Sequence, residues 1–179
     1  MPLSAFPDAV VVATKIEVEQ AYERLTADLQ RFVTNGDCIL IGIMMGGMIP
    51  MVRIAGMLSG DFTMDYCQVS RYRGAEHGGE LEWVQAPRAE LAGQTVLLVD
   101  DIYDEGITLE YVTKSCYAQG ATRVVSAVLV QKQHERRVGQ ILPDFVGLRV
   151  ADHYVFGCGM DYRHRWRNLP EIYALKEPA

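Results

Sequence analysis

The chain lacks an excess of positive charge and lacks any hydrophobic run long enough to cross a membrane. Of its 179 residues, 17 are lysine or arginine and 23 are aspartate or glutamate, which gives a formal net charge of −6. Proteins that bind nucleic acid or anionic lipid need a positive field, and a membrane-spanning helix needs roughly 18 consecutive apolar residues. We therefore expect neither a nucleic-acid partner nor a membrane.

Cysteine is scarce, and its spacing is uninformative. The four cysteines form no Cys-x-x-Cys pair and no metal-ligand pattern: Cys38, Cys67, Cys116 and Cys158. The first residues also lack the basic region and apolar core of a secretion signal. We expect buried, reduced thiols in a cytoplasmic protein.

Two common phosphate-binding motifs are absent as well. The chain contains no Gly-x-Gly-x-x-Gly sequence and no lysine-bearing Walker loop, which argues against a dinucleotide enzyme and a nucleoside triphosphatase. Its length and its 49% hydrophobic content allow a core without a disulfide or metal. We expect one domain over residues 1–179.

The order of apolar and amphipathic segments predicts the fold class. Thr14 and Glu17 form a capping box that begins an amphipathic helix, which the pattern continues to Asn35. Three continuous apolar runs predict strands buried on both faces: 38–44, 96–99 and 124–130. A helix over 108–119 separates the last two. This alternation predicts an α/β domain with a central, largely parallel sheet flanked by helices, whose ligand site lies at the carboxyl ends of the strands.

An acidic segment stands at the end of the strand predicted over 96–99. Asp100 and Asp101 are adjacent, and Asp104 and Gly106 follow before the next helix. Backbone N–H groups at a helix start favour phosphate, whereas adjacent carboxylates suit sugar hydroxyls or a magnesium ion. An acidic helix start without any ligand would have a similar composition.

Residues Val99 to Thr108 resemble the phosphoribosyl pyrophosphate (PRPP) signature of the type I phosphoribosyltransferases. Two further segments, Ala127 to Lys132 and Tyr154 to Leu169, resemble the purine-recognition part of the hypoxanthine-guanine branch of that family. The resemblance extends in order from about Ile39 to Leu169. It implies the type I phosphoribosyltransferase fold, with a small hood contributed by the terminal segments and a mobile lid loop.

The resemblance also implies an activity. Such a glycosyltransferase of purine salvage transfers the 5-phosphoribosyl group from PRPP to hypoxanthine or guanine, giving IMP or GMP and pyrophosphate. It uses Mg²⁺, and relatives commonly form homodimers or homotetramers.

Family roles transfer to the acidic segment residue by residue. By resemblance, Asp100 and Asp101 hold the ribose hydroxyls directly or through Mg²⁺, and Asp104 is the general base. The 5′-phosphate is bound by one continuous loop: Asp104, Glu105, Gly106, Ile107 and Thr108.

The same resemblance assigns the purine site. Lys132 donates to the 6-oxo oxygen, Tyr154 stacks on the ring, and main-chain groups of Val155 and Asp161 contact the remaining edge. An ammonium group has only donors, which favours a 6-oxopurine over adenine. Asp161 is also expected to meet a second magnesium ion.

Pyrophosphate contacts are implied for Met45, Gly46, Arg71 and Arg167. Met45 and Gly46 match a loop that binds through main-chain amides, often across a non-proline cis peptide, although relatives often carry a polar or basic residue at Met45. Arg71 replaces the serine of a Ser-Tyr pair in the lid, residues 71–79. A simple Gly-Gly turn and an exposed hairpin loop would show the same sequences.

Two alternative functions stay open at this point. One is a phosphoribosyltransferase for another base, xanthine or uracil, and the other is a non-catalytic regulator that binds PRPP or nucleotides. The four histidines show no ligand spacing, and we expect surface or packing roles for them: His77, His134, His153 and His164. The basic stretch 132–137 is interpreted as a strand end followed by a solvated turn.

Overall fold

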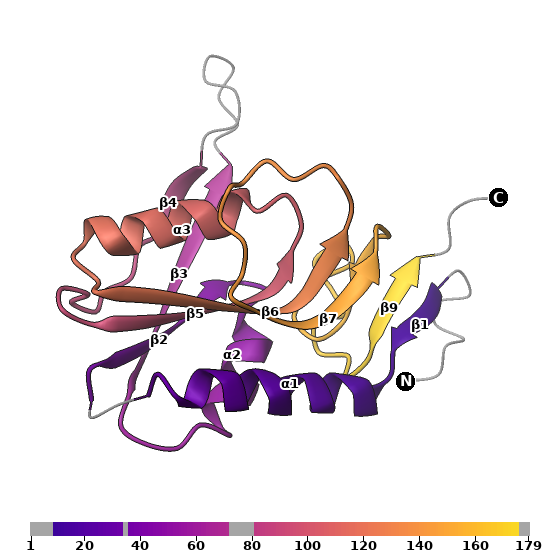
Figure 1. Ribbon diagram of the computed structural model, residues 1–179. Helices are drawn as coiled ribbons and strands as arrows, with labels where there is room; N and C mark the ends of the chain where they lie inside the picture. Colours follow the sequence, from indigo (N-terminus) through magenta and orange to yellow (C-terminus); the bar gives the residue numbers. More distant parts are fainter. Residues whose placement is uncertain (1–8, 34–35, 72–80, 176–179) are drawn as a thin grey trace, which may run out of the picture.

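A six-stranded sheet forms the centre of the computed structural model, which describes residues 9–33, 36–71 and 81–175 (Figure 1). Its strand order is β4-β3-β2-β5-β6-β7, and every neighbouring pair is parallel except β3 with β4. The strands are β2 (Cys38–Met44), β3 (Thr63–Arg71), β4 (Leu81–Gln85), β5 (Thr95–Tyr103), β6 (Arg123–Gln133) and β7 (Phe145–Ala151). The predicted α/β class with a largely parallel sheet is confirmed.

Helices cover both faces of this sheet. Figure 1 shows α1 (Lys15–Gln30) and α2 (Met48–Ala55) on one face and α3 (Ile107–Ala118) on the other. Leu40 and Leu97 pack in the core beneath α1 and α2, whereas Ile41 and Leu98 pack against α3. Successive strand residues therefore both meet a core, which explains why the strands are continuous apolar runs. Within the described ranges, no helix has the length and hydropathy to span a membrane.

The α1 helix begins at the predicted capping box. Thr14 Oγ1 accepts the Glu17 N–H, and the Glu17 carboxylate accepts the Thr14 N–H at 2.8 Å. The helix ends at Gln30, earlier than the pattern suggested, because the Phe32 N–H bonds to the Leu29 carbonyl only three residues back. This tightened last turn is a common helix ending.

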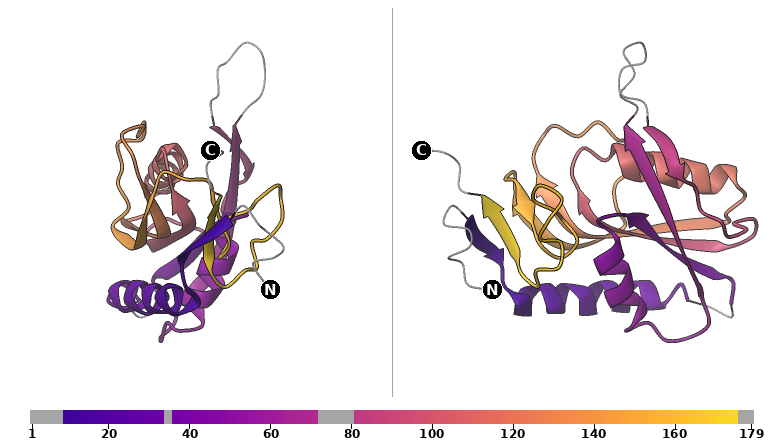
Figure 2. Two further views of the ribbon diagram at one scale, coloured as in Figure 1. Left: turned by 90° about the vertical axis from the view of Figure 1, so that its right-hand side faces the viewer. Right: turned by 180° about the vertical axis from the view of Figure 1, so that it is seen from behind.

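A second, antiparallel sheet joins the two ends of the described chain. It contains β1 (Ala9–Ala13), β9 (Ile172–Leu175) and β8 (Val155–Phe156) in the order β1-β9-β8. Ala9 pairs with Leu175, and the Phe156 and Tyr173 rings stack with centroids 5.4 Å apart. Figure 2 shows this small sheet at the end of the molecule nearest to β7.

All four cysteines are buried and unpaired, as expected. Burial raises the pKa of the Cys38 and Cys116 thiols to about 11 and that of Cys158 to about 12. Because the thiolate is the nucleophile, these groups are chemically inert at neutral pH.

Candidate functional site

The carboxyl ends of β2 and β5 meet around a cavity of about 430 Å³. Most of its lining is the acidic segment, from Asp100 through Leu109. The rest of the lining comes from β2 and the loop after it, from β3, from β6 and from the C-terminal region: Ile43, Met44, Gly46, Val69, Val128 and Arg167. The structure thus brings together segments that are far apart in the sequence, at the edge of the sheet where the topology places ligands.

Asp100 and Asp101 place two adjacent carboxyl groups in the wall of this cavity. They lie within β5, which extends to Tyr103 and so is longer than the predicted strand. Asp101 is 7% exposed, and its N–H donates to Asp100 Oδ1 at 2.9 Å. Burial raises the pKa of Asp100, and the neighbouring Asp101 charge raises it further. Burial also raises the pKa of Asp101, although Arg167 acts in the opposite direction.

This donor set fits a divalent cation. The carboxylate oxygens of Asp100 and Asp101 are hard ligands at a cavity wall, of the type that Mg²⁺ prefers. Bringing both carboxylates to the ionised state in a desolvated strand is costly, and a dication would remove that cost. Asp100 and Asp101 are therefore the residues of this cavity that could hold Mg²⁺.

The Asp100→Asn variant is expected to be more stable than the wild type but less active. Because the pKa of Asp100 is raised on folding, the ionised group costs stability above its folded pKa, and the cost disappears below the unfolded value of about 3.9. At pH 7.5 without metal, the variant should gain about 1 kcal/mol, or 2–4 °C in melting temperature. The gain should shrink as the pH falls toward 4.

Thermal unfolding at several pH values measures this effect, and Glu90→Gln is the control because Glu90 is an exposed acidic residue. An unchanged or lower melting temperature for Asp100→Asn at pH 7.5 would contradict the inferred electrostatic cost. The same scans with Mg²⁺ should show stabilisation of the wild type and little of the variant.

The loop between β5 and α3 presents backbone rather than side chains at the helix start. Gly106 adopts a φ of +83° and gives α3 no side-chain cap, and a Cβ at this position would lie 2.5 Å from the Tyr103 hydroxyl oxygen. The Val138 and Gly139 N–H groups both donate to the Glu105 carbonyl at 2.9 Å. These two hydrogen bonds fix the Glu105 carbonyl and, with it, the loop. The first N–H groups of a helix have no intrahelical partner, so this geometry suits a phosphate group.

The loop after β2 also contributes to the acidic cavity. The Met44–Met45 peptide bond is cis, as the resemblance suggested for this position. Met44 and Gly46 line the acidic cavity, whereas Met45, which is 47% exposed, lines an apolar cavity together with Met44, Met48 and Met64. Met45 is thus not among the residues that line the acidic cavity.

A smaller cavity of about 190 Å³ is lined by every residue that is predicted to contact a purine. Its lining includes Lys132, Tyr154, Val155 and Asp161. Asp101 lines both cavities, so the two spaces adjoin. Tyr154 is 51% exposed, and its hydroxyl donates to the Asp161 carbonyl at 3.0 Å.

Arg167 lines the acidic cavity and contacts Asp161, which lines the smaller one. Its Nη2 donates to Asp161 Oδ1 at 2.5 Å and its Nη1 donates to the Gly159 carbonyl at 2.6 Å. The other Asp161 oxygen, Oδ2, accepts the His164 N–H at 2.8 Å. A metal ion at Asp161 would have to share an oxygen with Arg167, so Asp161 fits a metal less well than the Asp100–Asp101 pair.

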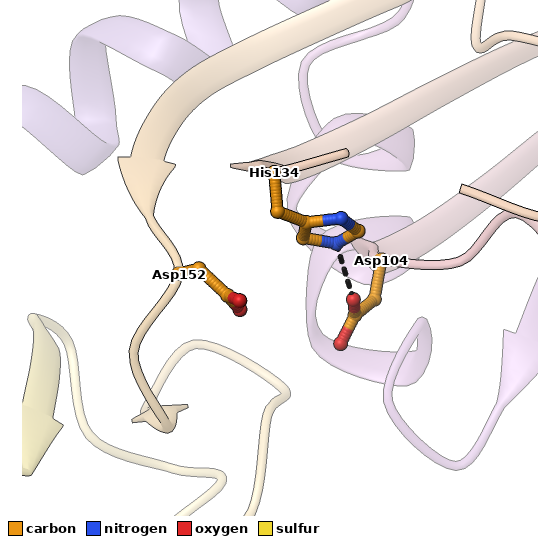
Figure 3. A group of neighbouring side chains, drawn as sticks. All are labelled: Asp104, His134 and Asp152. Carbon is orange, nitrogen blue, oxygen red and sulfur yellow. Dashed lines mark hydrogen bonds and ion pairs between the residues drawn. The ribbon is translucent and has the colours of Figure 1, made fainter. Parts of the chain in front are cut away.

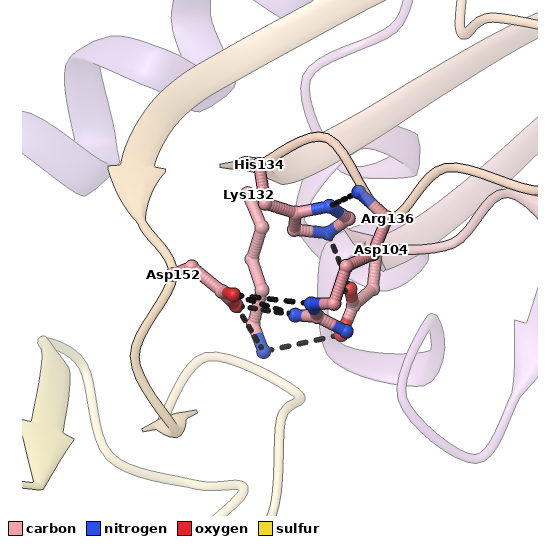
Figure 4. A network of polar contacts seen from close by, with 5 residues as sticks. All are labelled: Asp104, Lys132, His134, Arg136 and Asp152. Carbon is pink, nitrogen blue, oxygen red and sulfur yellow. Dashed lines mark hydrogen bonds and ion pairs between the residues drawn. The ribbon is translucent and has the colours of Figure 1, made fainter.

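Asp104 lines the acidic cavity and also belongs to a polar cluster at its edge. Figure 3 shows Asp104, His134 and Asp152 pointing toward one another; each directly follows one of the parallel strands β5, β6 and β7. Their ligand atoms lie within 4.8 Å of one another, as in a metal site. However, Lys132 Nζ lies 3.1 Å from Asp104 and 3.6 Å from Asp152, and Arg136 Nη2 lies 2.6 Å from Asp152 (Figure 4). Two cations already neutralise the two carboxylates, which disfavours a metal ion.

His134 is not a surface residue, and its ring has a polar partner in this cluster. Its side chain is 6% exposed, and its Nε2 lies 2.6 Å from Asp104 Oδ1. The sequence carried a signal for this contact, because Lys132 and His134 are two residues apart, the spacing at which side chains share one face of a strand. The interpretation of residues 132–137 as a strand end followed by a solvated turn did not predict this contact.

The lid prediction lies mainly outside the described residues. Arg71 ends β3 and pairs with Leu81 across the β3–β4 hairpin, while residues 72–80 are not described. On either side of these residues, Thr63–Arg71 and Leu81–Gln85 form an antiparallel hairpin.

Comparison with known proteins agrees with this geometry. Residues 13–164 match the model of the phosphoribosyl transferase domain. Hypoxanthine-guanine phosphoribosyltransferase of Streptococcus pneumoniae is 32% identical over 168 residues, or 93% of each chain. The Bacillus subtilis enzyme of the same name is 29% identical over 167 residues, 93% of this chain and 92% of its own. A crystal structure of hypoxanthine phosphoribosyltransferase from Staphylococcus aureus matches with a TM-score of 0.89 and 26% identity, covering 98% of this chain and 96% of that one. The chain belongs to the phosphoribosyltransferase family.

Proposed function

We propose that the protein is a purine salvage enzyme that transfers the 5-phosphoribosyl group from PRPP to hypoxanthine or guanine. The observation that carries this proposal is the pair of adjoining cavities that share Asp101. One cavity combines carboxylates with a helix start and so suits a phosphorylated sugar, and the other combines a lysine with an exposed tyrosine ring and so suits a 6-oxopurine. The names of the similar proteins support the same activity.

The acidic cavity would bind PRPP. Asp100 and Asp101 would hold the ribose hydroxyls and Mg²⁺, and the N–H groups of the loop from Asp104 to Thr108 would bind the 5′-phosphate. When bound, Mg²⁺ neutralises charge on the departing pyrophosphate. Main-chain amides at Met45 and Gly46 would contact the pyrophosphate from the opposite side.

Two arginines would add side-chain contacts to the pyrophosphate. The planar fork of Arg167 suits phosphate oxygens, and Arg167 already lines the cavity. Arg71 ends the strand that leads into the proposed lid, residues 71–79. A closed lid would keep water from the reacting sugar carbon.

The smaller cavity would bind the base. Lys132 Nζ would donate to the 6-oxo oxygen, Tyr154 would stack on the ring, and main-chain groups of Val155 and Asp161 would contact the far edge. Because an ammonium cannot accept a hydrogen bond from an amino group, this site disfavours adenine.

Asp104 would accept the proton that the base loses. As a nitrogen of the purine five-membered ring bonds to the sugar carbon, the bond from that carbon to pyrophosphate breaks and its electron pair leaves with pyrophosphate. The proton of the ring nitrogen passes to the Asp104 carboxylate. This is the step for which the side chain at Asp104 must be a base.

We further propose that residues 1–179 form one domain, in which the β1-β9-β8 sheet is the hood over the base site. The protein would act in the cytoplasm as a homodimer or homotetramer, without nucleic acid or membrane. These points rest on the resemblance to the family and on the small sheet that joins both ends of the described chain.

One panel of reactions tests the function. The protein is incubated with PRPP and Mg²⁺ and with hypoxanthine, guanine, xanthine, adenine or uracil, and nucleotide formation is followed by chromatography. IMP and GMP are expected, with little or no AMP. Product from xanthine or uracil alone would instead establish a phosphoribosyltransferase for another base. PRPP binding without any nucleotide would favour a non-catalytic regulator.

A further inference from the structure

The hydrogen bonds of His134 define which of its nitrogens carries a proton. The Arg136 backbone N–H donates to His134 Nδ1 at 3.0 Å, so Nδ1 must present a lone pair. A neutral imidazole with an unprotonated Nδ1 carries its proton on Nε2. Nε2, which lies 2.6 Å from Asp104 Oδ1, is therefore the donor of that hydrogen bond.

This arrangement excludes His134 itself from the role of general base. Nε2 already carries a proton, and the lone pair of Nδ1 is engaged by the main chain at Arg136. The ring is also fixed in place, because its side chain is 6% exposed and both nitrogens are bonded. What such a group can do is hold the orientation of the carboxylate that it contacts.

We propose that His134 is a positioning residue for Asp104, an inference that rests on the proposed function. The two Asp104 oxygens have different partners: His134 donates to Oδ1, from which the Arg136 Nη2 is 3.7 Å away, while Lys132 Nζ lies 3.1 Å from Oδ2 (Figure 4). When Lys132 turns to the 6-oxo oxygen of a bound base, Oδ2 loses its partner and becomes free to accept the purine proton. His134 keeps Oδ1 in place through this exchange.

The position of His134 in the fold suits this task. It directly follows β6, and Asp104 directly follows β5, so two neighbouring parallel strands present the donor and the acceptor at the same edge of the sheet (Figure 3). Rigid elements hold a site more accurately than loops do, and small displacements of a reacting group cost large factors in rate.

Two variants separate the hydrogen bond from the space that the ring fills. His134→Gln keeps an N–H donor at comparable reach, whereas His134→Leu has similar bulk and no donor. We expect His134→Leu to lower kcat with hypoxanthine by about tenfold to a hundredfold. The KM for PRPP should change less than about twofold in both variants, and His134→Gln should recover most of the lost kcat.

A double-mutant cycle distinguishes positioning from general structural support. In an Asp104→Asn background the carboxylate base is gone, so His134→Leu should change the residual rate by less than about twofold. A purely structural role would give the same fractional loss in both backgrounds and a matching fall in melting temperature.

The outcomes separate this inference from the proposed function. If the wild type forms IMP but His134→Leu keeps full kcat, or His134→Gln is no better than His134→Leu, the positioning role is wrong and the function stands. Equal losses in both backgrounds would also overturn the positioning role. If the wild type forms no nucleotide from any base, both proposals fail.

Discussion

Replacement of Asp104 by asparagine is expected to lower kcat for hypoxanthine by about 10²- to 10⁴-fold, the usual range for loss of a general base. The affinity for PRPP should change by less than about threefold, because the loop would bind the 5′-phosphate through backbone N–H groups that the substitution leaves in place. A loss confined to kcat is the signature of an interaction made only in the transition state.

The surroundings of Asp104 make asparagine an especially poor replacement. The carboxylate lies between two donors, His134 Nε2 at 2.6 Å and Lys132 Nζ at 3.1 Å. An amide has one acceptor oxygen and one NH₂ group, so whichever way it turns, one of its donors meets another donor. Lys132 also loses the carboxylate that lies nearest to it and keeps only Asp152 at 3.6 Å.

Steady-state kinetics with hypoxanthine and direct titration of PRPP in the presence of Mg²⁺ measure the two quantities separately. Asp152→Asn is the matched control, because Asp152 contacts Lys132 and Arg136 in the same cluster but follows β7 instead of β5. It should lower kcat by less than about tenfold. An Asp104→Asn enzyme that keeps more than a tenth of the wild-type kcat would remove Asp104 from the role of base.

The sequence predicted those parts of the fold that depend on local patterns. The capping box at Thr14 predicted the start of α1, because two reciprocal hydrogen bonds within four residues define it. Continuous apolar runs predicted β2 and the first part of β5, since a strand covered on both faces needs apolar residues at every position.

Strand ends were predicted less well, because pairing rather than composition decides them. The acidic pair Asp100–Asp101 looked like the end of a strand, yet β5 continues to Tyr103, which pairs with Gln131 of β6. Backbone hydrogen bonds between parallel strands tolerate polar side chains where a ligand site, rather than a helix, covers them. A prediction based on side-chain polarity alone therefore ended β5 too early.

The cluster around Asp104 could be predicted only in part. Asp104, His134 and Asp152 are 30 and 18 residues apart, and they meet because β5, β6 and β7 are neighbours in register. No single segment of the sequence specifies the order of the strands in the sheet. The two-residue spacing of Lys132 and His134 is a local pattern, however, and it predicts that both side chains share one face of a strand. The strand predicted over 124–130 was too short to include them, whereas β6 extends to Gln133.

Substitution of Gly46 by alanine should strongly damage the site. Gly46 packs directly against Asp101, and a Cβ at this position would overlap the Asp101 carboxylate. The backbone of Gly46 does not adopt a positive φ, so alanine is conformationally allowed, and the three atoms nearest to the new Cβ all belong to the Asp101 carboxylate. We expect kcat/KM for PRPP to fall by about a hundredfold or more, since Asp101 must move.

Stability should fall as well, by about 1–3 kcal/mol, as is usual for overpacking. Thermal unfolding would register this as a decrease of about 2–10 °C. Gly56→Ala is the control, because a Cβ at Gly56 would lie 3.5 Å from the Val52 carbonyl, an ordinary contact at the end of α2. Near-normal kinetics and melting temperature for Gly46→Ala would show that the loop after β2 can move away from Asp101 without consequence.

The double variant Gly46→Ala/Asp101→Ala decides whether the conflict is steric. Removing the carboxylate makes room for the new methyl group and also removes the like charge beside Asp100, which contributes to the raised pKa of Asp100. The melting temperature should therefore return to at least the wild-type value, while activity stays low because Asp101 is gone. If stability does not recover, the requirement at Gly46 lies in its backbone rather than in its contact with Asp101. Recovery of stability without activity would show that glycine at this position makes room for a buried carboxylate that costs stability and is needed for turnover.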